Sequence, residues 1–447
     1  MLKDPSPQQY ELEMVTLDQL VPKNHLVRKV DTAIDFEFIR DEVKDLYCQD
    51  NGRPPVDPVR LFKIMLLGYL FGVPSERKLV KEIEVNVAYR WFLKMGLTEK
   101  VIDASTLSQN RIRRFNDTDV FERIFNNIVE QAMSKGLVGG HALYTDSTHL
   151  KANANKNKSK NQFKPVSPSA YIDDVNEAVE RDRIAQGKKP FKEKNYTQIK
   201  RNKVSTTDSD SGYMHRDEKP KGFFYLDHRT VDGKNNIIVD SHVTPGNVND
   251  SQPYIQRIDH ISNTFNINPI VAGIDAGYFS APICHALEER NIAGVFGYRR
   301  PSRTKNKFKK KPFDYDAKID QYTCPAGKKL IYKTTSRDGY REYHSNAKEC
   351  AECPLLRDCT QSQNHKKVIT RHVMEVSKER ANERRLTDWG KKVYKRRCAT
   401  VERSFADAKQ HHGHRYARFR SLIKVQMQCL LAATAQKMKK MALVEAY

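Results

Sequence analysis

The sequence predicts an α+β fold in which a helical N-terminal part precedes a core built around a β-sheet. Three observations carry this prediction. Residues 17–135 form a succession of short helix patterns separated by tight turns, and helical patterning returns from about Lys378 to the end of the chain. Between them lie strand patterns, a hairpin signal and a helix pattern, which together indicate one sheet with helices packed on it.

The N-terminal helices are marked by their first residues. Asp57 precedes a proline and a long apolar run, the pattern of an N-cap followed by proline at the first helical position. Ser75 opens a second helix after a Gly-Val-Pro break, and a further helix begins near Asp119 and ends at Gly136. We therefore expect a helical, helix-turn-helix-like domain over residues 1–136.

A short basic helix within this domain is a candidate for DNA contact. It follows the capping sequence that starts at Asp103 and contains LSQNRIRRF. Its arginines could reach phosphates, but helical bundles that touch no DNA are commoner, so both interpretations stay open. The candidate side chains are Arg111, Arg113 and Arg114.

The expected core begins after Gly140. Residues 141–152 have a strand pattern with Asp146 at the end of the strand. Residues 151–203 are rich in Lys, Asn, Ser and Pro, and they are expected to be a basic insertion or flexible linker that is partly helical.

The rest of the core pattern leads to a division into domains. Two strands, in GFFYLDHRTVD and NNIIVDSHVTPGN, flank the hairpin turn at 232–235. A buried strand then leads to Asp275, ICHALEERNI follows as a helix, and AGVFGYRR follows as another strand. We expect the first part of the core over 137–300, a basic, cysteine-containing insertion over 301–377, and the helical end of the core over 378–447.

The charge of the chain is large, positive and unevenly placed. The 447 residues carry 78 Lys and Arg against 55 Asp and Glu, a net charge of +23, yet residues 1–150 hold 20 bases and 22 acids. Residues 391–447 hold 14 bases and 3 acids, so a polyanion has to be met mainly by the second two-thirds of the chain. Nucleic acid is the expected partner, because the sequence lacks the basic amphipathic helices with an aromatic face that an anionic membrane requires.

Apolar patterning and cysteine usage bear on location. No window approaches 18 apolar residues, and the N-terminal sequence lacks an apolar signal core. Eight cysteines in a long chain of this kind do not indicate a disulfide framework. We expect a cytoplasmic protein without a membrane span.

Three carboxylates differ from the other acids by their surroundings. Asp146 and Asp275 follow apolar segments, where an acid is costly unless it caps a helix or binds a cation. Capping is a ready alternative for Asp275 and a weaker one for Asp146. Glu402 lies on the same general side of a helix as Val401 and Phe405, so it would be costly there unless it faced a metal or an arginine.

With their contexts YTDST, GIDAGY and TVERSF, these acids resemble the Asp-Asp-Glu constellation of insertion-sequence transposases, members of the ribonuclease H-like, retroviral-integrase-like superfamily. DPVRLFKIMLLGYLFGVPSERKLVKEIEVNVAYRWFL resembles the helical N-terminal domain of this group. KPKGFFYLDHRTVD and VTPGNVNDS resemble its second and third strands. The last helical region resembles the family's Tyr-Arg-Glu-Lys signature in Tyr394, Arg397, Glu402 and Lys409. Four residues separate Arg397 from Glu402 where the signature has three, so Arg396 is the alternative arginine.

The resemblance implies a ribonuclease H-like catalytic core with an insertion before the last catalytic helix, and the activity of a DNA transposase. Such an enzyme binds the terminal inverted repeats of its insertion sequence, cuts DNA and joins the ends to target DNA. Asp146, Asp275 and Glu402 would be its catalytic residues and would hold two Mg²⁺ or Mn²⁺ ions. The resemblance further implies that the partner is double-stranded DNA, that the protein forms a homodimer on this DNA, and that it is nucleoid-associated in a bacterium.

Basic and aromatic side chains near the glutamate would then hold phosphates. A solvated basic face of the helix is the alternative. The candidates are Tyr394, Arg397, Arg403 and Lys409. The loop at 301–311 adds six Lys and Arg without an acid.

Four cysteines lie close together in the predicted insertion. Cys350-x2-Cys353 matches one half of a structural Zn²⁺ site, which Cys324 and Cys359 could complete. Reduced thiols without a metal are the alternative. An iron–sulfur cluster is disfavoured, because nothing in the sequence indicates electron transfer.

Two other functions stay open from the sequence. A non-enzymatic DNA-binding regulator could use the helical N-terminus and the basic tail, although acids beside phosphates would give it no advantage. Another ribonuclease H-like nuclease would share the carboxylates, but such enzymes are generally much shorter and lack the helical N-terminal domain.

Overall fold

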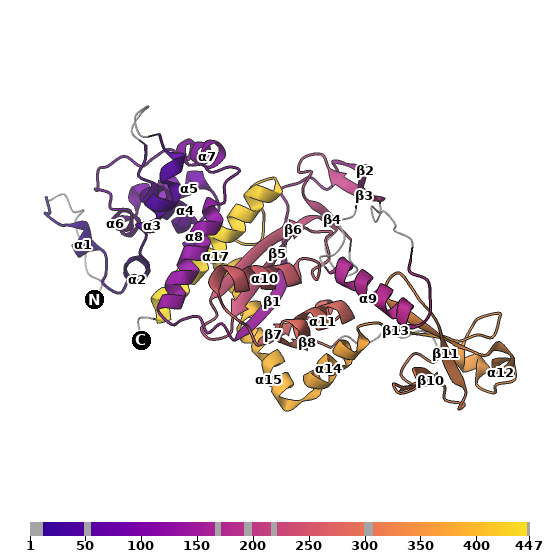
Figure 1. The fold of residues 1–447 in the computed structure, drawn as a ribbon. Helices are drawn as coiled ribbons and strands as arrows, with labels where there is room; N and C mark the ends of the chain where they lie inside the picture. The colour runs from indigo at the N-terminus through magenta and orange to yellow at the C-terminus, as the bar shows by residue number, and fades with distance from the viewer. Residues whose placement is uncertain are drawn as a thin grey trace, which may run out of the picture.

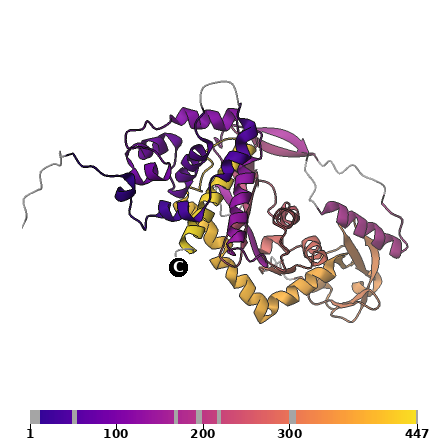
Figure 2. The same ribbon diagram turned by 60° about the vertical axis from the view of Figure 1, so that its left-hand side comes forward.

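The computed structural model describes residues 12–48, 55–165, 171–191, 199–215, 221–298 and 307–444. Helices of the N-terminal part lie on one side, a mixed sheet lies in the middle, and a second sheet lies at the far end (Figures 1 and 2). The predicted fold class is confirmed, because a helical N-terminal region precedes an α/β core.

The N-terminal helices begin at the predicted capping residues. The Asp57 carboxylate accepts a hydrogen bond from the Val59 N–H at 3.2 Å, and the Ser75 hydroxyl accepts one from the Lys78 N–H at 3.2 Å. Gly136, with φ +66°, follows the last of these helices. The elements are α1 (Leu17–Leu20), α2 (Leu26–Ala33), α3 (Phe38–Val43), η1 (Lys44–Leu46), α4 (Pro58–Leu70), α5 (Glu76–Val85), α6 (Val87–Phe92), α7 (Ala104–Arg113) and α8 (Val120–Ser134).

The central sheet has the strand order β6-β5-β1-β7-β8. β1, β5 and β6 form an antiparallel meander, and β7 and β8 extend it in parallel from the other edge of β1. This is the arrangement expected of a ribonuclease H-like core. The strands are β1 (Ala142–Lys151), β5 (Gly222–Asp232), β6 (Ile238–Pro245), β7 (Val271–Ile274) and β8 (Ala293–Phe296), and the short β4 (Gly212–Met214) pairs with the start of β5.

The strand that carries Asp146 lies within the predicted residues 141–152, but it does not end at Asp146. β1 continues to Lys151, because β5 keeps pairing with it as far as the Lys151–Phe224 pair. Its parallel pairing with β7 stops at Thr145. The prediction that Asp146 ends the strand is therefore wrong, and Asp146 instead lies just past the place where β1 loses its parallel neighbour.

Helices cover the sheet and connect it to the N-terminal part. They are α10 (Tyr254–Phe265), η2 (Ala276–Tyr278), α11 (Ala281–Glu289), α14 (Glu375–Leu386), α15 (Asp388–Arg396), η3 (Arg397–Ala399), α16 (Val401–His411) and α17 (Leu422–Val444). α17 packs against β6 and also against α2, α4 and α8, as Figures 1 and 2 show. The buried Lys437 of α17 donates a hydrogen bond to the Phe125 carbonyl of α8 at 2.9 Å. One apolar core therefore extends from the N-terminal helices to the sheet.

The segment 151–203 contains regular structure of its own. β2 (Ser159–Pro165) and β3 (Ile199–Ser205) pair with each other, and α9 (Ile172–Ala185) lies between them in the chain. α9 buries Val175 and Val179 in a small apolar cluster with Met374. In its described parts the segment is therefore an insertion with its own helix and strands. The alternative interpretation as a flexible linker is wrong for these parts, because strand pairing and apolar burial give them a fixed structure.

The second sheet, called the outer sheet from here on, consists of β9 to β13. Its strands are β9 (Asp314–Asp316), β10 (Gln321–Thr323), β11 (Lys329–Thr335), β12 (Tyr340–Ser345) and β13 (Val368–His372), and all neighbours pair antiparallel. α12 (Ala347–Ala351) and α13 (Leu356–Cys359) connect β12 to β13. Residues 301–306 of the predicted basic loop lie outside the described residues.

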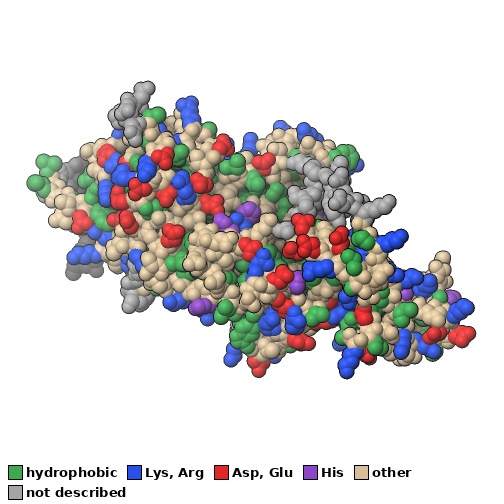
Figure 3. All heavy atoms as spheres, in the orientation of Figure 1, with side chains coloured by type: hydrophobic (Ala, Val, Ile, Leu, Met, Phe, Trp, Pro, Cys, Tyr) green, Lys and Arg blue, Asp and Glu red, His purple; other side chains and the backbone are tan. Residues whose placement is uncertain are grey.

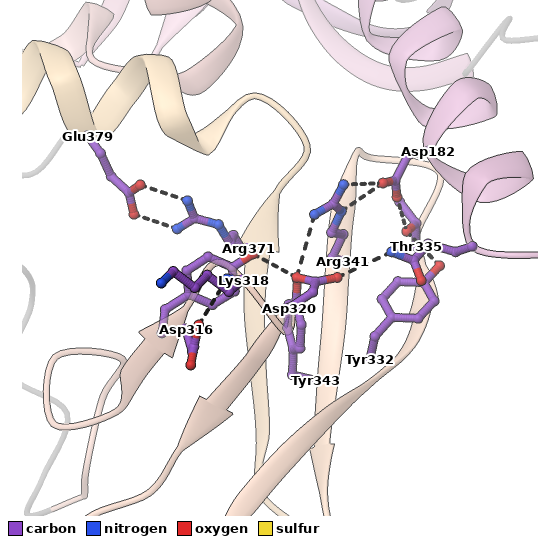
Figure 4. Close-up of polar contacts among 12 residues, drawn as sticks. Asp182, Asp316, Lys318, Asp320, Tyr332, Thr335, Arg341, Tyr343, Arg371 and Glu379 are labelled. Atoms are coloured by element: carbon purple, nitrogen blue, oxygen red, sulfur yellow. Dashed lines mark hydrogen bonds and ion pairs between the residues drawn. The ribbon is translucent and has the colours of Figure 1, made fainter.

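Polar contacts attach the outer sheet to the neighbouring helices (Figure 4). Asp182 of α9 accepts hydrogen bonds from Arg341 Nε at 2.8 Å and from the Thr335 hydroxyl at 2.6 Å. Arg371 of β13 donates to Glu379 of α14 at 2.7 Å. The outer sheet is thereby joined both to the insertion and to the helix that leads toward Glu402.

The surface agrees with the uneven charge of the sequence. On the face in Figure 3, Lys and Arg alternate with Asp and Glu over the N-terminal helices, where the numbers of bases and acids nearly cancel. Within the described parts of the chain, no helix combines the length and the apolar character needed to cross a membrane.

Candidate active site

The two predicted aspartates lie on neighbouring strands. Thr145 of β1 pairs with Ile274 of β7 in parallel register, so Asp146 and Asp275 are the next residues on adjacent strands. Glu402 lies in the first turn of α16, which packs against β1 and β5. The structure thus brings together three acids that are far apart in the sequence.

The guanidinium of Arg397 lies between these three acids. Its Nη2 donates to Asp146 Oδ2 at 2.7 Å, and its Nη1 lies 3.6 Å from both Asp275 Oδ1 and Glu402 Oε1. The Arg397 side chain is 2% exposed, whereas those of Asp275 and Glu402 are 48% and 46% exposed. Asp275 and Glu402 therefore face solvent, and the arginine between the acids is buried.

A break in the helix explains how Arg397 reaches this position. α15 ends at Arg396, the single turn η3 follows, and Thr400 has φ −110° and ψ −99° before α16 begins. Arg396 turns away and donates a hydrogen bond to the Gly233 carbonyl. The irregular turn accommodates the extra residue between Arg397 and Glu402, so Arg397, and not Arg396, is the arginine beside the acids.

Burial and charge act in opposite directions on the first aspartate. Burial raises the pKa of Asp146 to about 6, although the charge of Arg397 and the Ser147 N–H, which donates at 2.8 Å, both lower it. Two nearby acids, Asp275 and Asp250, add to the rise. Asp146 therefore gives up its proton less readily than an ordinary aspartate.

The immediate surroundings of the cluster are tightly packed. Arg397 Nη1 donates to the Tyr394 hydroxyl at 3.3 Å. A Cβ at Gly297 would lie 2.5 Å from that hydroxyl, so only glycine fits there without displacing Tyr394. Asp275 also accepts a hydrogen bond from the Gly277 N–H at 3.4 Å. Asp275 therefore caps the turn η2 and at the same time lies beside the other two acids.

Sequence analysis missed Asp250 as a neighbour of the site. It follows β6 in VTPGNVND, and its charge adds to the raised pKa of Asp146. The available signal was an acid in a turn after β6, a strand that pairs with β5 and not with β1, and such an acid is by itself a common surface pattern.

The donor set fits a divalent cation. Three carboxylates from separate elements face one positive group, and oxygen donors of this kind are preferred by Mg²⁺ and Mn²⁺. Across the described residues, three ligating atoms lie within 4.8 Å of one another only at Asp227, His414 and Cys429. The carboxylates are spread more widely because they surround a guanidinium.

The buried group around Asp227 is a hydrogen-bond network within the core. Asp227 accepts hydrogen bonds from Arg229 at 2.7 Å, from His414 at 2.8 Å and from Ser241 at 2.9 Å. Although burial opposes ionisation, the charge of Arg229 and the contact with His414 hold the pKa of Asp227 well below its usual range. These contacts satisfy the carboxylate and connect β5 to the turn after α16.

The candidate DNA contacts around the site differ in exposure. Arg403 is 68% exposed and pairs with Asp407 at 3.0 Å. Tyr394 and Lys409 are partly exposed. Arg397 is buried and paired with the acids, so it is not available at the surface to contact a phosphate.

The arginines of α7 are divided between surface and core. Arg113 is exposed. Arg114 stacks on Tyr47 at 3.9 Å from the ring centre. Arg111 is buried, pairs with Glu76 and lies over the Phe419 ring, so its prediction as a DNA contact is wrong: its guanidinium is committed to partners from distant parts of the chain.

A pocket of about 700 Å³ lies beside the glutamate helix. Its lining includes Thr400 and Arg403 at the start of α16 and Lys439 and Lys440 near the end of α17. The two lysines were missed in the sequence, because α17 is recognisable there only as an apolar helix. The pocket therefore adds Lys439 and Lys440 to the basic side chains near Arg403.

Comparisons with known families agree with this geometry. The transposase domain DUF772 matches residues 15–113, and the transposase DDE domain matches residues 323–442. Together with the strand order and the converging acids, these matches define a DDE transposase. The chain is a DNA transposase of this class, which implies metal-dependent DNA cleavage and strand transfer.

Solved structures give weaker likenesses. The piggyBac transposase synaptic complex with hairpin DNA is 9% identical with a TM-score of 0.31, over 94% of this chain and 78% of that one. The Mos1 transposase paired-end complex with the left transposon end is 11% identical with a TM-score of 0.16, over 56% and 61% of the two chains. A comparison with curated proteins finds no match.

Proposed function

We propose that this transposase binds the terminal inverted repeats of its own insertion sequence, cuts at their ends and joins them to target DNA, with Asp146, Asp275 and Glu402 as catalytic residues. The observation that carries the proposal is the convergence of these three acids on the guanidinium of Arg397. One carboxylate would suffice to pair with this buried arginine, so the presence of three, of which Asp275 and Glu402 are about half exposed, is better explained by a metal site.

The three carboxylates would hold two Mg²⁺ or Mn²⁺ ions. When bound, these ions supply charge to the attacking and leaving oxygens of an in-line displacement at phosphorus. The chain itself contributes the frame: β1 and β7 hold the aspartates side by side, and α16 carries the glutamate over them. Arg397 keeps the three acids together when no cation neutralises them and so preserves the site between reactions.

Phosphates of double-stranded DNA would approach along α16. Arg403 and Lys409 lie on the same helix as Glu402, and Lys439 and Lys440 line the adjoining pocket. Tyr394 at the edge of the acid cluster could contact a phosphate near the reacting one. In the N-terminal domain, Arg113 is the exposed candidate for a second contact.

Two further parts of the proposal concern assembly and place. Both ends of an insertion sequence have to be cut and joined together, so we propose a homodimer assembled on DNA. We also propose a cytoplasmic, nucleoid-associated location in a bacterium, because the proposed substrate is DNA and the sequence resembles insertion-sequence transposases.

The test uses the DNA that flanks the reading frame. Fragments that end in its inverted repeats should be cut by the purified full chain with Mg²⁺, and a pre-cleaved end should be joined to a target plasmid. The matched control is a fragment with a scrambled repeat, which should be neither cut nor joined. Cleavage of both fragments alike, without joining, would reduce the activity to that of a nuclease and overturn the proposal.

A further inference from the structure

The four cysteines of the outer sheet surround one small pocket. They come from the end of β10, from α12, from the turn after it and from the end of α13. The same pocket is lined by apolar side chains such as Phe313, Leu330 and Leu356. Each of the four thiols is free of a disulfide. We propose that this pocket is a structural zinc site whose ligands are Cys324, Cys350, Cys353 and Cys359.

Two of these cysteines, Cys350 and Cys359, lie on the short helices α12 and α13, and Cys353 lies in the turn between them. Neither α12 nor α13 contains a buried residue. Helices of five and four residues are too short to be stable alone. Something other than apolar burial has to hold them against the outer sheet, and a metal bound through their cysteines would do so.

The loop at Cys324 already has a form suited to a metal-bound thiolate. The Lys328 N–H donates to Cys324 Sγ at 3.3 Å, and the Cys324 N–H donates to the Lys328 carbonyl at 2.8 Å. Gly327 permits this tight turn because its φ is +73°. A backbone N–H directed at sulfur stabilises the thiolate over the thiol, as the outer contacts of metal ligands generally do.

Positive charge lies where a negative metal–thiolate cluster would need it. Four thiolates and one Zn²⁺ leave a net charge of −2, and Lys328 and Lys367 both line the pocket. Lys367 Nζ is fixed by hydrogen bonds to the Cys359 and Phe308 carbonyls at 2.9 and 2.6 Å. Burial raises the pKa of the Cys359 thiol and the neighbouring thiols add to this, while Lys367 opposes it.

Metal binding would draw the sulfurs together. Among these four described side chains, no three sulfur atoms lie within 4.8 Å of one another, and a tetrahedral zinc site with Zn–S bonds of about 2.3 Å needs about 3.8 Å between sulfurs. Rotation of the side chains can supply the difference. Cys350, for example, now donates to the Ser345 hydroxyl at 3.2 Å and would exchange this contact for the metal. Because four thiolates complete the coordination, the site would be structural and not catalytic.

The test measures zinc in the full chain purified after growth with added zinc and dialysed against a weak chelator. We expect about one zinc per chain in the wild type and in Cys48→Ser, the control, since Cys48 is exposed and lies in the N-terminal part. The double variant Cys350→Ser, Cys353→Ser should lose at least nine-tenths of it. Asp275→Asn should keep its zinc, which separates this site from the carboxylates.

A second measurement keeps the test decisive if the double variant fails to fold. Wild-type protein reconstituted with Co²⁺ should show the thiolate-to-cobalt charge-transfer absorption of a tetrahedral site, and added Zn²⁺ should remove it. Wild-type protein with less than a tenth of an equivalent of zinc, or Co²⁺ bound without that absorption, would overturn the proposal. Either result would mean that the four cysteines are reduced thiols without a metal, and it would not affect the proposed transposase activity.

Discussion

The central sheet and the outer sheet are held together by different forces. Every residue of β5 in the central sheet is buried, and helices cover the strands on both sides of the acids. The outer sheet has only a small apolar cluster, and it is attached to α9 and α14 through ion pairs such as Arg341–Asp182. Its buried apolar residues are Phe313, Tyr322, Leu330, Tyr343 and Ile369.

This difference determines what each sheet can do. Apolar burial on a continuous core holds β1 and β7 in register, so the two aspartates lie side by side before any ligand arrives. A sheet whose stability depends on charges and thiols is instead sensitive to pH, salt and metal removal. We therefore expect changes in the central sheet to alter the chemistry, and changes in the outer sheet to alter local stability.

The largest effect is expected at the carboxylates of the central sheet. Asp146→Asn, Asp275→Asn and Glu402→Gln should each lower the rate of DNA cleavage in Mg²⁺ by roughly 10³-fold or more, because each would remove a charged oxygen ligand of the proposed metal site. DNA affinity, measured by fluorescence anisotropy, should stay within about twofold, since acids do not attract phosphates.

Asp259→Asn is the matched control for this series. Asp259 is a partly exposed acid of α10 that pairs with Arg290, so its loss should leave cleavage unchanged. If one of the three site variants cut DNA as fast as this control, that residue would have no catalytic role.

The three acids could be recognised from the sequence, but their common partner could not. Each acid carries a local signal, an apolar strand before Asp146 and Asp275 and a helix face for Glu402. The helix caps at Asp57 and Ser75 and the bounds of β5 also depend on short sequence patterns, and the structure confirms them. The central place of Arg397 depends on an irregular turn at Thr400 and on three distant segments, which no local pattern encodes.

The fate of Arg111 illustrates the same limit. A basic helix predicts exposed arginines, yet Arg111 meets Glu76 from an earlier helix and Phe419 from the far end of the chain. The position of α17 among the N-terminal helices was equally hidden, since an apolar helix does not indicate which neighbours bury it. Long-range packing decides both cases.

The next largest effect is expected where the outer sheet meets α9. Asp182→Ala removes the acceptor of both Arg341 and Thr335, two contacts drawn in Figure 4. Arg341 keeps Asp320 at 3.7 Å, so the loss of its closer partner should cost about 2 kcal/mol. Limited proteolysis followed by mass spectrometry should show cleavage within 307–372 at least tenfold faster than in the wild type.

Asp316→Ala is the control for the outer sheet. Asp316 is exposed and accepts only from the Lys318 N–H among the bonds drawn in Figure 4, so proteolysis should be nearly unchanged. Equal protection of Asp182→Ala and the wild type would mean that apolar contacts alone hold the outer sheet, and the contrast between the two sheets would fail.

A smaller effect concerns the proton on Asp146. Its pKa is raised to about 6, so the folded protein keeps a proton that the unfolded chain releases near pH 4. This group therefore favours the folded state below about pH 4, and that contribution is lost as the pH rises to about 6. Metal affinity should instead increase with pH, because a metal ion binds the ionised carboxylate.

Calorimetric titration should follow this proton. Mg²⁺ or Mn²⁺ should bind about tenfold more weakly at pH 5 than at pH 7, since only about a tenth of Asp146 is ionised at the lower pH. Arg397→Gln should move the midpoint of this dependence upward, because Arg397 lowers the pKa of Asp146. A midpoint near pH 4 in both proteins would show that burial does not govern this carboxyl.

The smallest effect separates the two sheets by their contacts with DNA. Arg403 lies one residue after Glu402 and is 68% exposed, so Arg403→Ala should remove about one phosphate contact without loss of stability. The slope of log K against log[salt], about −5 if roughly six phosphates are neutralised, should then become shallower by about 0.9. Lys311 of the basic loop before the outer sheet is also exposed and serves as the comparison.

If the slope changes in Arg403→Ala but not in Lys311→Ala, phosphate binding is confined to the side of the central sheet. A slope unchanged in Arg403→Ala would remove α16 from the path of the DNA, because an exposed cation beside the reacting phosphate has to contribute to counterion release.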